Sequence, residues 1–175
     1  MAKILIVFST TDGHTHDISQ KISEVLVNEG NEVNLHALAD GDVENLESYD
    51  KVIVGASIRY GKHQKIVYDF VKDHELELDK LKNAFFSVNV VARKSEKNKP
   101  STNPYMQKFL KQISWKPKNL AVFAGRLDYP TYTYFDRQMI RFIMWMTKGP
   151  TAKDTVVEYT NWSEVESFAH QMAID

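Results

Sequence analysis

Short runs of β-branched and aromatic residues alternate along this chain with longer stretches whose apolar residues recur at helical spacing. The short runs predict five strands, at residues 3–8, 32–37, 51–56, 84–91 and 119–124. The longer stretches predict helices at residues 14–28, 64–74, 103–113 and 162–172. This alternation is typical of parallel sheets whose strands are joined by crossover helices. We therefore predict an α/β fold, a single domain over residues 1–175 with a three-layer, doubly wound, five-stranded parallel sheet.

The charge and the residue composition narrow the classes of partner and site. A total of 22 Lys and Arg against 23 Asp and Glu gives a net charge of −1, which offers nucleic acid no attractive field. The chain has no cysteine, which excludes disulfides, thiolate metal sites and cysteine nucleophiles. Its six histidines are scattered without the spacing of metal ligands, so we predict no metal site. No apolar run is long enough to cross a bilayer or to form the core of a signal peptide.

The loop after the first predicted strand is rich in hydroxyl groups and leads directly into a helix. It consists of Ser9, Thr10, Thr11, Asp12, Gly13, His14 and Thr15. Hydroxyl groups and the free N–H groups of a helix N-terminus can together bind a phosphate monoester. The strings GxxxxGKS/T and GxGxxG do not occur, so neither a nucleoside triphosphate loop nor a dinucleotide fingerprint is predicted. The alternative is that the Thr and Asp side chains only cap the helix.

Two further loops follow the third and fourth predicted strands, at the sheet edge where doubly wound folds bind ligands. The candidate binding residues there are Ser57, Ile58, Arg59, Tyr60, Gly61, Asn89, Val90, Val91 and Arg93. Tyr60 can stack on a planar ring, and Gly61 lets the backbone approach a ligand closely. The alternative is that Tyr60 is an ordinary aromatic residue of a loop.

The first loop is similar to the flavodoxin signature S/T-x-T-G-x-T, with Thr10, Gly13 and Thr15 at matching positions. Asp12 replaces the second threonine, and because a carboxylate repels phosphate we expect it to turn away and cap the helix. The resemblance implies a flavodoxin-like fold with strand order 2-1-3-4-5 and FMN as the cofactor. It also implies that the first loop binds the FMN phosphate and that the two later loops flank the isoalloxazine ring.

Three segments together, FSTTDGHT, GASIRYG and SVNVVARK, resemble the quinone-coupled, FMN-dependent protoporphyrinogen oxidases of γ-proteobacterial type. The resemblance extends over nearly the whole chain. It implies oxidation of protoporphyrinogen IX to protoporphyrin IX in haem biosynthesis, with menaquinone or ubiquinone as electron acceptor. The flavin itself would supply the redox chemistry, and no side chain is assigned as acid or base. We hypothesise that Arg59, Arg93, Arg137 or Arg141 pairs with the porphyrin propionates.

A long insertion of about residues 125–160 separates the fifth predicted strand from the last helix. It predicts a helix from about Tyr134 to Lys148 whose apolar face carries Phe135, Met139, Ile140, Phe142, Ile143, Met144 and Met146. The opposite stripe carries Arg137, Arg141 and Lys148, edged by Tyr134 and Trp145. Such a pattern is typical of a helix in the plane of a membrane surface, so we expect peripheral attachment to the cytoplasmic face of the inner membrane. The alternative is a helix that packs on its own domain.

The residues leave three other functions open. These are a soluble electron carrier of flavodoxin type, an NAD(P)H:quinone reductase and a flavin-free membrane adaptor. Carriers of that type tend to be strongly acidic, which the net charge of −1 does not match. A reductase would consume NAD(P)H, and an adaptor would bind no flavin.

Overall fold

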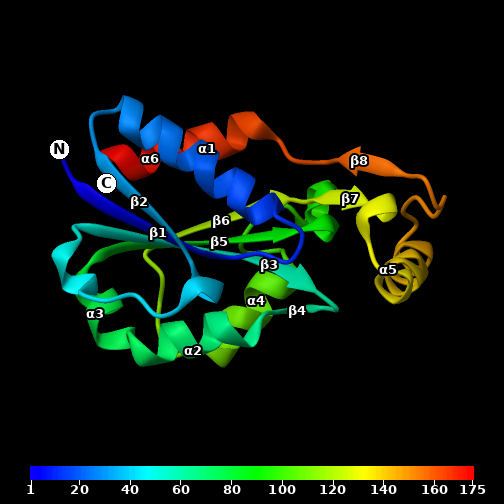
Figure 1. Ribbon diagram of the computed structural model, residues 1–175, viewed down its shortest axis with the longest axis horizontal. Coiled ribbons are helices and arrows are strands. Elements are labelled where there is room, and N and C mark those ends of the chain that lie inside the picture. The colour runs from blue at the N-terminus through cyan, green and yellow to red at the C-terminus, as the bar shows by residue number, and fades with distance from the viewer.

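The computed structural model describes residues 1–175 and forms an α/β fold around a parallel sheet (Figure 1). The strand order is β2-β1-β3-β5-β6, and every pair along this path is parallel. The strands are β1 (Lys3–Ser9), β2 (Glu32–Ala37), β3 (Lys51–Arg59), β5 (Lys82–Asn89) and β6 (Asn119–Ala124). The predicted five-stranded order 2-1-3-4-5 is confirmed, with β5 and β6 as the fourth and fifth strands.

Helices cover both faces of this sheet. Helices α1 (His14–Asn28) and α6 (Trp162–Ile174) lie on one face, and α2 (Lys65–Asp73), α3 (Glu75–Lys80) and α4 (Pro104–Gln112) lie on the other (Figure 1). Helix α3 is short and polar and was not expected from the sequence pattern. The connections contain 3-10 helices, namely η1 (Leu38–Asp40), η2 (Leu46–Ser48), η3 (Val90–Arg93), η4 (Ser95–Lys97) and η5 (Tyr129–Thr131).

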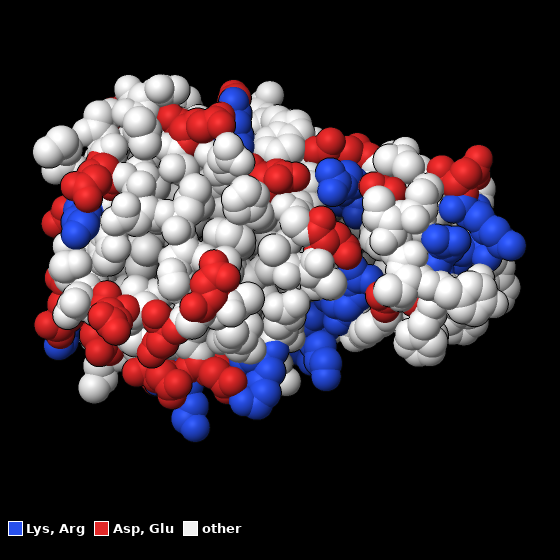
Figure 2. All heavy atoms as spheres, viewed as in Figure 1, with Lys and Arg blue, Asp and Glu red and all other residues white.

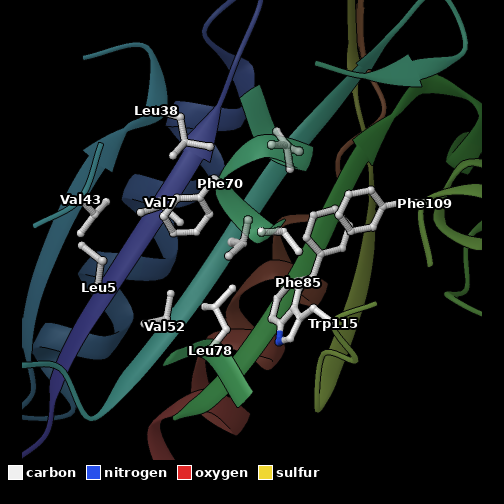
Figure 3. Packing of buried hydrophobic residues seen from close by; sticks show 14 of the residues in the cluster. Leu5, Val7, Leu38, Val43, Val52, Phe70, Leu78, Phe85, Phe109 and Trp115 are labelled. Carbon is white, nitrogen blue, oxygen red and sulfur yellow. The ribbon is translucent and has the colours of Figure 1, made fainter. Parts of the chain in front are cut away.

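Alternate residues of the strands face opposite layers of the fold. Leu5 and Val7 of β1 belong to the buried cluster beneath α2, α3 and α4 (Figure 3). The same cluster contains the stacked rings of Phe85 and Phe109, whose centres are 4.2 Å apart. Ile4 of β1 belongs to the second cluster, beneath α1 and α6. Because helices cover both faces with their apolar sides toward the sheet, the three-layer arrangement is confirmed.

Strand β3 continues beyond its predicted end at residue 56. Residues 57–59 extend it, and β4 (Lys62–His63) folds back on it as an antiparallel hairpin. Tyr60 and Gly61 form the turn with positive φ angles of 52° and 77°, as a type I′ turn requires. The prediction of a loop is therefore wrong for residues 57–59, because this turn geometry lets the strand continue.

Strand β5 ends earlier than its pattern predicts. It stops at Asn89, whose side-chain Oδ1 accepts a hydrogen bond from the N–H of Ala92 and so caps η3. Val90 and Val91, predicted as strand residues, lie in this 3-10 helix instead. The capping bond ends the strand, although the two valines have high strand propensity.

The insertion lies beyond the carboxyl ends of the central strands (Figure 1). It contains an antiparallel pair, β7 (Arg126–Asp128) and β8 (Val156–Glu158), and helix α5 (Tyr134–Met146). Helix α5 ends before the predicted boundary at Lys148, because that residue has a left-handed φ of 59° and cannot continue the helix. No helix of the fold combines the length and the apolar composition needed to cross a membrane.

Candidate functional site

A cleft opens at the carboxyl ends of β1, β3 and β5, and the insertion forms its far side. The open space in and at the mouth of this cleft amounts to about 970 Å³. All the residues predicted to bind the cofactor line this cleft, except Ser9 and Gly13. The structure therefore brings together three segments that are far apart in the sequence.

The first loop leads into α1 without a side-chain cap on the helix. Gly13 precedes the helix with a left-handed φ of 86°, and its N–H donates to Oγ1 of Thr10 at 2.9 Å. Asp12 pairs with the guanidinium of Arg59, so the predicted capping role of Asp12 is wrong. The physical reason is that a guanidinium offers the carboxylate a charge-assisted bond, which is stronger than a bond to a neutral backbone N–H.

Two polar atoms of this loop are buried without a hydrogen-bond partner. They are Oγ1 of Thr15, a residue with no exposed surface, and Nδ1 of His14. A buried hydroxyl without a partner is unfavourable, and a phosphate oxygen would satisfy it where the first N–H groups of α1 converge. The loop therefore fits the phosphate monoester of FMN, with Thr15 as one of its donors.

Gln64, which sequence reasoning missed, holds the first loop in place. The hydroxyl of Ser9 donates to its Oε1 at 2.5 Å, and its Nε2 donates to Oγ1 of Thr11 at 3.1 Å. Ser9 is buried and supports the loop from beneath, which explains why it does not line the cleft. Because Gln64 directly precedes α2, it ties the first loop to the hairpin on the neighbouring strand.

His14 lies at the start of α1, on the edge of the cleft. Its Nε2 is 2.6 Å from the hydroxyl of Thr160, which donates to the carbonyl of Ala124 at 2.7 Å. Burial lowers the pKa of His14 below its ordinary value, and the nearby carboxylate of Glu158 opposes that shift. His14 is therefore neutral near pH 7. The positive charge in the lining of the cleft comes from arginines.

The β3–β4 hairpin forms one wall of the cleft and contacts the insertion. The hydroxyl of Tyr60 donates to the carboxylate of Asp136 in α5, and 43% of the Tyr60 surface stays exposed. The Arg59 guanidinium lies 3.9 Å from the same carboxylate and 5.2 Å from the ring centre of Tyr132. Tyr60 is thus placed on the wall with a ring face available to a planar ligand.

The η3 loop forms another wall, and Asn89 holds it in place. Oδ1 of Asn89 accepts hydrogen bonds from the N–H of Ala92 at 3.1 Å and from Nδ2 of Asn103 at 3.0 Å. Its Nδ2 donates to the hydroxyl of Ser87 at 3.2 Å. That hydroxyl lies 2.9 Å from Nε2 of His63. Burial lowers the pKa of His63 to about 3, so this histidine is neutral. Asn89 therefore uses its polar atoms to fix the loop.

The four arginines named as candidate partners of the propionates are all bonded within the protein. Arg59 and Arg93 line the cleft. Arg59 pairs with Asp12, as described above. Arg93 donates to the carbonyl of Val90 at 3.1 Å and to the carbonyl of Thr147 at 3.2 Å. It thereby connects the η3 loop to the C-terminal end of α5.

Arg137 and Arg141 do not line the cleft. Arg137 donates to the carbonyl of Tyr129 at 2.9 Å, and Arg141 donates to the carbonyl of Thr151 at 2.7 Å. Both therefore stabilise the chain on either side of α5. Pairing with a propionate stays a prediction, and position favours Arg59 and Arg93 for it. Arg126, which sequence reasoning missed, also lines the cleft.

The insertion wall contains most of the lining residues that sequence reasoning missed. They include Leu127, Asp128, Thr131, Tyr132 and Thr147. Helical periodicity placed Ile140, Ile143 and Met144 on an apolar face but did not show which part of that face turns inward. In the structure these three line the cleft, whereas Phe135 and Phe142 of the same face are exposed.

Comparison with known proteins decides the family. The flavodoxin domain matches residues 5–154. The chain belongs to the flavodoxin family. The structure of a flavodoxin from Streptococcus pneumoniae TIGR4 is similar to this one, with a TM-score of 0.57 and 15% identity. The alignment covers 99% of each chain. A mutant flavodoxin from Pseudomonas aeruginosa is also similar, with a TM-score of 0.57 and 9% identity. The alignment covers 98% of this chain and 97% of the flavodoxin. These likenesses confirm the flavodoxin-like fold.

Curated relatives place the chain more closely within that family. The protoporphyrinogen IX dehydrogenase (quinone) of Escherichia coli K12 is 44% identical over 174 residues, which covers 98% of this chain and 94% of the relative. The protein of the same name from Leishmania major is 45% identical over 172 residues, covering 98% of this chain and 74% of the relative. The resemblance carried by the three loop segments is therefore confirmed.

Proposed function

We propose that this flavodoxin-family chain is an FMN-dependent dehydrogenase of haem biosynthesis, which oxidises protoporphyrinogen IX to protoporphyrin IX with menaquinone or ubiquinone as electron acceptor. The observation that carries the proposal is the 44% identity, over 98% of the chain, to a relative named for this reaction. The cleft supports it, because a phosphate-binding loop and an apolar wall of the insertion face one space.

Three segments of the cleft divide the binding of FMN between them. The N–H groups of the first loop and the hydroxyl of Thr15, which has no partner in the protein, would hold the phosphate. Arg59 neutralises the carboxylate of Asp12, which would otherwise repel that phosphate. Tyr60 would cover the ring system of the flavin, and backbone N–H groups of the η3 loop would bind its carbonyl oxygens. Bound FMN supplies the hydride acceptor and the electron donor to the quinone.

The protein contributes binding, orientation and the exclusion of water. No side chain is assigned as acid or base, because the Nε2 atoms of His14 and His63 are engaged by Thr160 and Ser87, and His63 is buried edge-on against the rings of Phe85 and Phe109. The apolar side chains of α5 that line the cleft exclude water from the reacting groups.

The same helix supports a proposal of peripheral attachment to the cytoplasmic face of the inner membrane. Its exposed residues are Tyr134, Phe135, Met139, Phe142, Trp145 and Met146. Figure 2 shows Lys and Arg side chains beside the uncharged surface at this end of the molecule. Exposed aromatic residues suit the acyl boundary of a bilayer, and cations suit anionic head groups. Attachment here would bring the cleft to two apolar substrates that dissolve in the membrane.

The proposed reaction can be tested by measuring which compound reduces the bound flavin. Protoporphyrinogen IX, mixed anaerobically with the FMN-loaded protein, should bleach the visible absorbance of the flavin, and a menaquinone analogue should restore it. NADH and NADPH should leave the absorbance unchanged. Rapid bleaching by NAD(P)H, with none by the porphyrinogen, would contradict the proposal and indicate an NAD(P)H:quinone reductase.

A further inference from the structure

We propose that Asp136, in the first turn of α5, is a positioning residue for the FMN site, because it fixes Arg59 and Tyr60 on the wall of the cleft. This inference rests on the FMN part of the proposed function and not on the identity of the reductant or the quinone. It gives the insertion a role in cofactor binding, in addition to the membrane contact proposed above.

Both carboxylate oxygens of Asp136 are engaged. The hydroxyl of Tyr60 donates to Oδ1, and the hydroxyl of Thr133 donates to Oδ2 at 3.0 Å. Thr133 also caps the helix, since its Oγ1 accepts a bond from the N–H of Asp136 at 3.2 Å. Nη1 of Arg59 lies 3.9 Å from Oδ2. The carboxylate is therefore fixed by its own helix end and holds two neighbouring residues of the hairpin.

Tyr60 needs such a partner because its hairpin is too short to fix it. The pairing of β3 with β4 consists of two residue pairs. Tyr60 sits in the turn with a left-handed φ of 52°, a region that bulky residues rarely adopt. Almost half of its surface is exposed, so packing alone does not set the orientation of its ring. The bond to Asp136 supplies that orientation.

Arg59 connects the first loop, the hairpin and the insertion. Its guanidinium pairs with Asp12, faces Asp136 and lies 5.2 Å from the ring centre of Tyr132. Its Nη1 is buried and has no hydrogen-bond partner, so this N–H group is free to donate to a ligand. Asp136 holds the guanidinium where it offsets the charge of Asp12 beside the phosphate loop. Without Asp136, Arg59 keeps its pair with Asp12 but loses the second carboxylate that sets the direction of its guanidinium.

The test compares FMN binding by the apoprotein and its variants. We expect Asp136→Ala to raise the FMN dissociation constant about tenfold, measured by fluorescence quenching, and to reduce the visible circular dichroism of the bound flavin. Asp136→Asn keeps an oxygen for Tyr60 but loses the charge that faces Arg59, so its effect should be smaller. Asp154→Ala, at an exposed aspartate of the same insertion, is the matched control and should change neither quantity.

A double-mutant cycle separates positioning from a general loss of structure. In a background of Arg59→Gln with Tyr60→Phe, adding Asp136→Ala should raise the dissociation constant by less than about threefold. A protein that binds FMN but does not oxidise the porphyrinogen would contradict the proposed reaction alone, because this readout is cofactor binding. If Asp136→Ala fails to fold, Asp136→Asn takes its place in the cycle. An equal effect in both backgrounds, or unchanged binding and dichroism, would overturn the proposal.

Discussion

The sheet domain and the insertion are stabilised in different ways. On the two faces of the sheet lie apolar clusters of 18 and 15 buried residues. The insertion has a cluster of four, Leu127, Tyr129, Tyr132 and Met144. Arginine bonds to backbone carbonyls also hold the insertion together internally, and Arg59 and Arg93 connect it to the sheet domain. Because a few polar bonds resist local opening less than a large apolar core does, we expect the insertion to open without unfolding the sheet.

Because of this difference, one part of the cleft should be rigid and the wall formed by the insertion should be able to move. The first loop and the η3 loop directly follow the buried strands β1 and β5, so the phosphate end of the proposed FMN site is preorganised. The insertion wall depends on the Asp136 contacts at one end of α5 and on the Arg93 contacts at the other. A wall of this kind is suited to admitting a large substrate beside a fixed cofactor.

The largest effect on stability should come from the sheet core. Phe85→Ala removes a fully buried ring that stacks on Phe109, so the free energy of unfolding should fall by about 3–5 kcal/mol in a urea titration. Leu76→Ala, at an exposed residue of α3, should change it by less than about 0.5 kcal/mol. A loss below about 1 kcal/mol for Phe85→Ala would contradict the assignment of stability to this cluster.

The next largest effect should be on membrane binding by the insertion. Phe142 and Trp145 stack on each other and are 53% and 68% exposed. Replacing both with serine should weaken binding to anionic phospholipid vesicles by at least about a hundredfold in a sedimentation assay, because each buried aromatic side chain contributes about 1.5–3 kcal/mol. Val27→Ser, at an exposed apolar residue of α1, should bind normally. Equal binding by both variants would argue against attachment through α5.

A smaller effect should be seen on the local stability of the insertion, separate from the global stability of the protein. Arg137 donates to the carbonyls of Tyr129 at 2.9 Å and Tyr132 at 3.2 Å. Arg137→Ala should speed hydrogen exchange in η5 and α5 by an amount that corresponds to about 1–3 kcal/mol, with the unfolding of the sheet domain unchanged. Lys153→Ala, at an exposed lysine, should alter neither. An equal loss of global stability would show that the two regions unfold as one unit.

A further prediction concerns the pH dependence of the sheet domain. His63 has a pKa of about 3 when folded, against about 6.5 when unfolded, so between these values the unfolded chain binds one more proton. The free energy of unfolding should therefore fall as the pH drops from about 6 toward 4, by about 1.4 kcal/mol per pH unit. His63→Gln should remove this slope in urea titrations, and His16→Gln, on exposed α1 surface, should keep it. Unchanged slopes in both would contradict the assignment.

The parallel sheet could be predicted because each of its elements carries a local pattern. The run VIVGA at residues 52–56 is apolar throughout, since β3 is covered on both faces. Helix α1 places Ile18, Ile22 and Leu26 on the side that meets the sheet. Such patterns indicate which face of an element is buried, even when the element that packs against it is unknown.

The polar contacts of the cleft could not be predicted because they join distant residues. Asp12 and Arg59 are 47 positions apart, and Tyr60 and Asp136 are 76 apart. On local grounds a carboxylate at a helix start indicates a cap, and only the fold brings a guanidinium to it. The hairpin was missed for a related reason, because Tyr60 replaces the Asn or Asp that usually signals a type I′ turn.

Quinone-dependent formation of porphyrin tests the central claim most directly. FMN-loaded protein is mixed anaerobically with protoporphyrinogen IX, with and without a menaquinone analogue, and the fluorescence of protoporphyrin IX is followed. We predict that the quinone stimulates porphyrin formation well above the enzyme-free control. No stimulation by the quinone, with the flavin bound and reducible, would contradict the proposed function and favour an electron carrier or an NAD(P)H reductase.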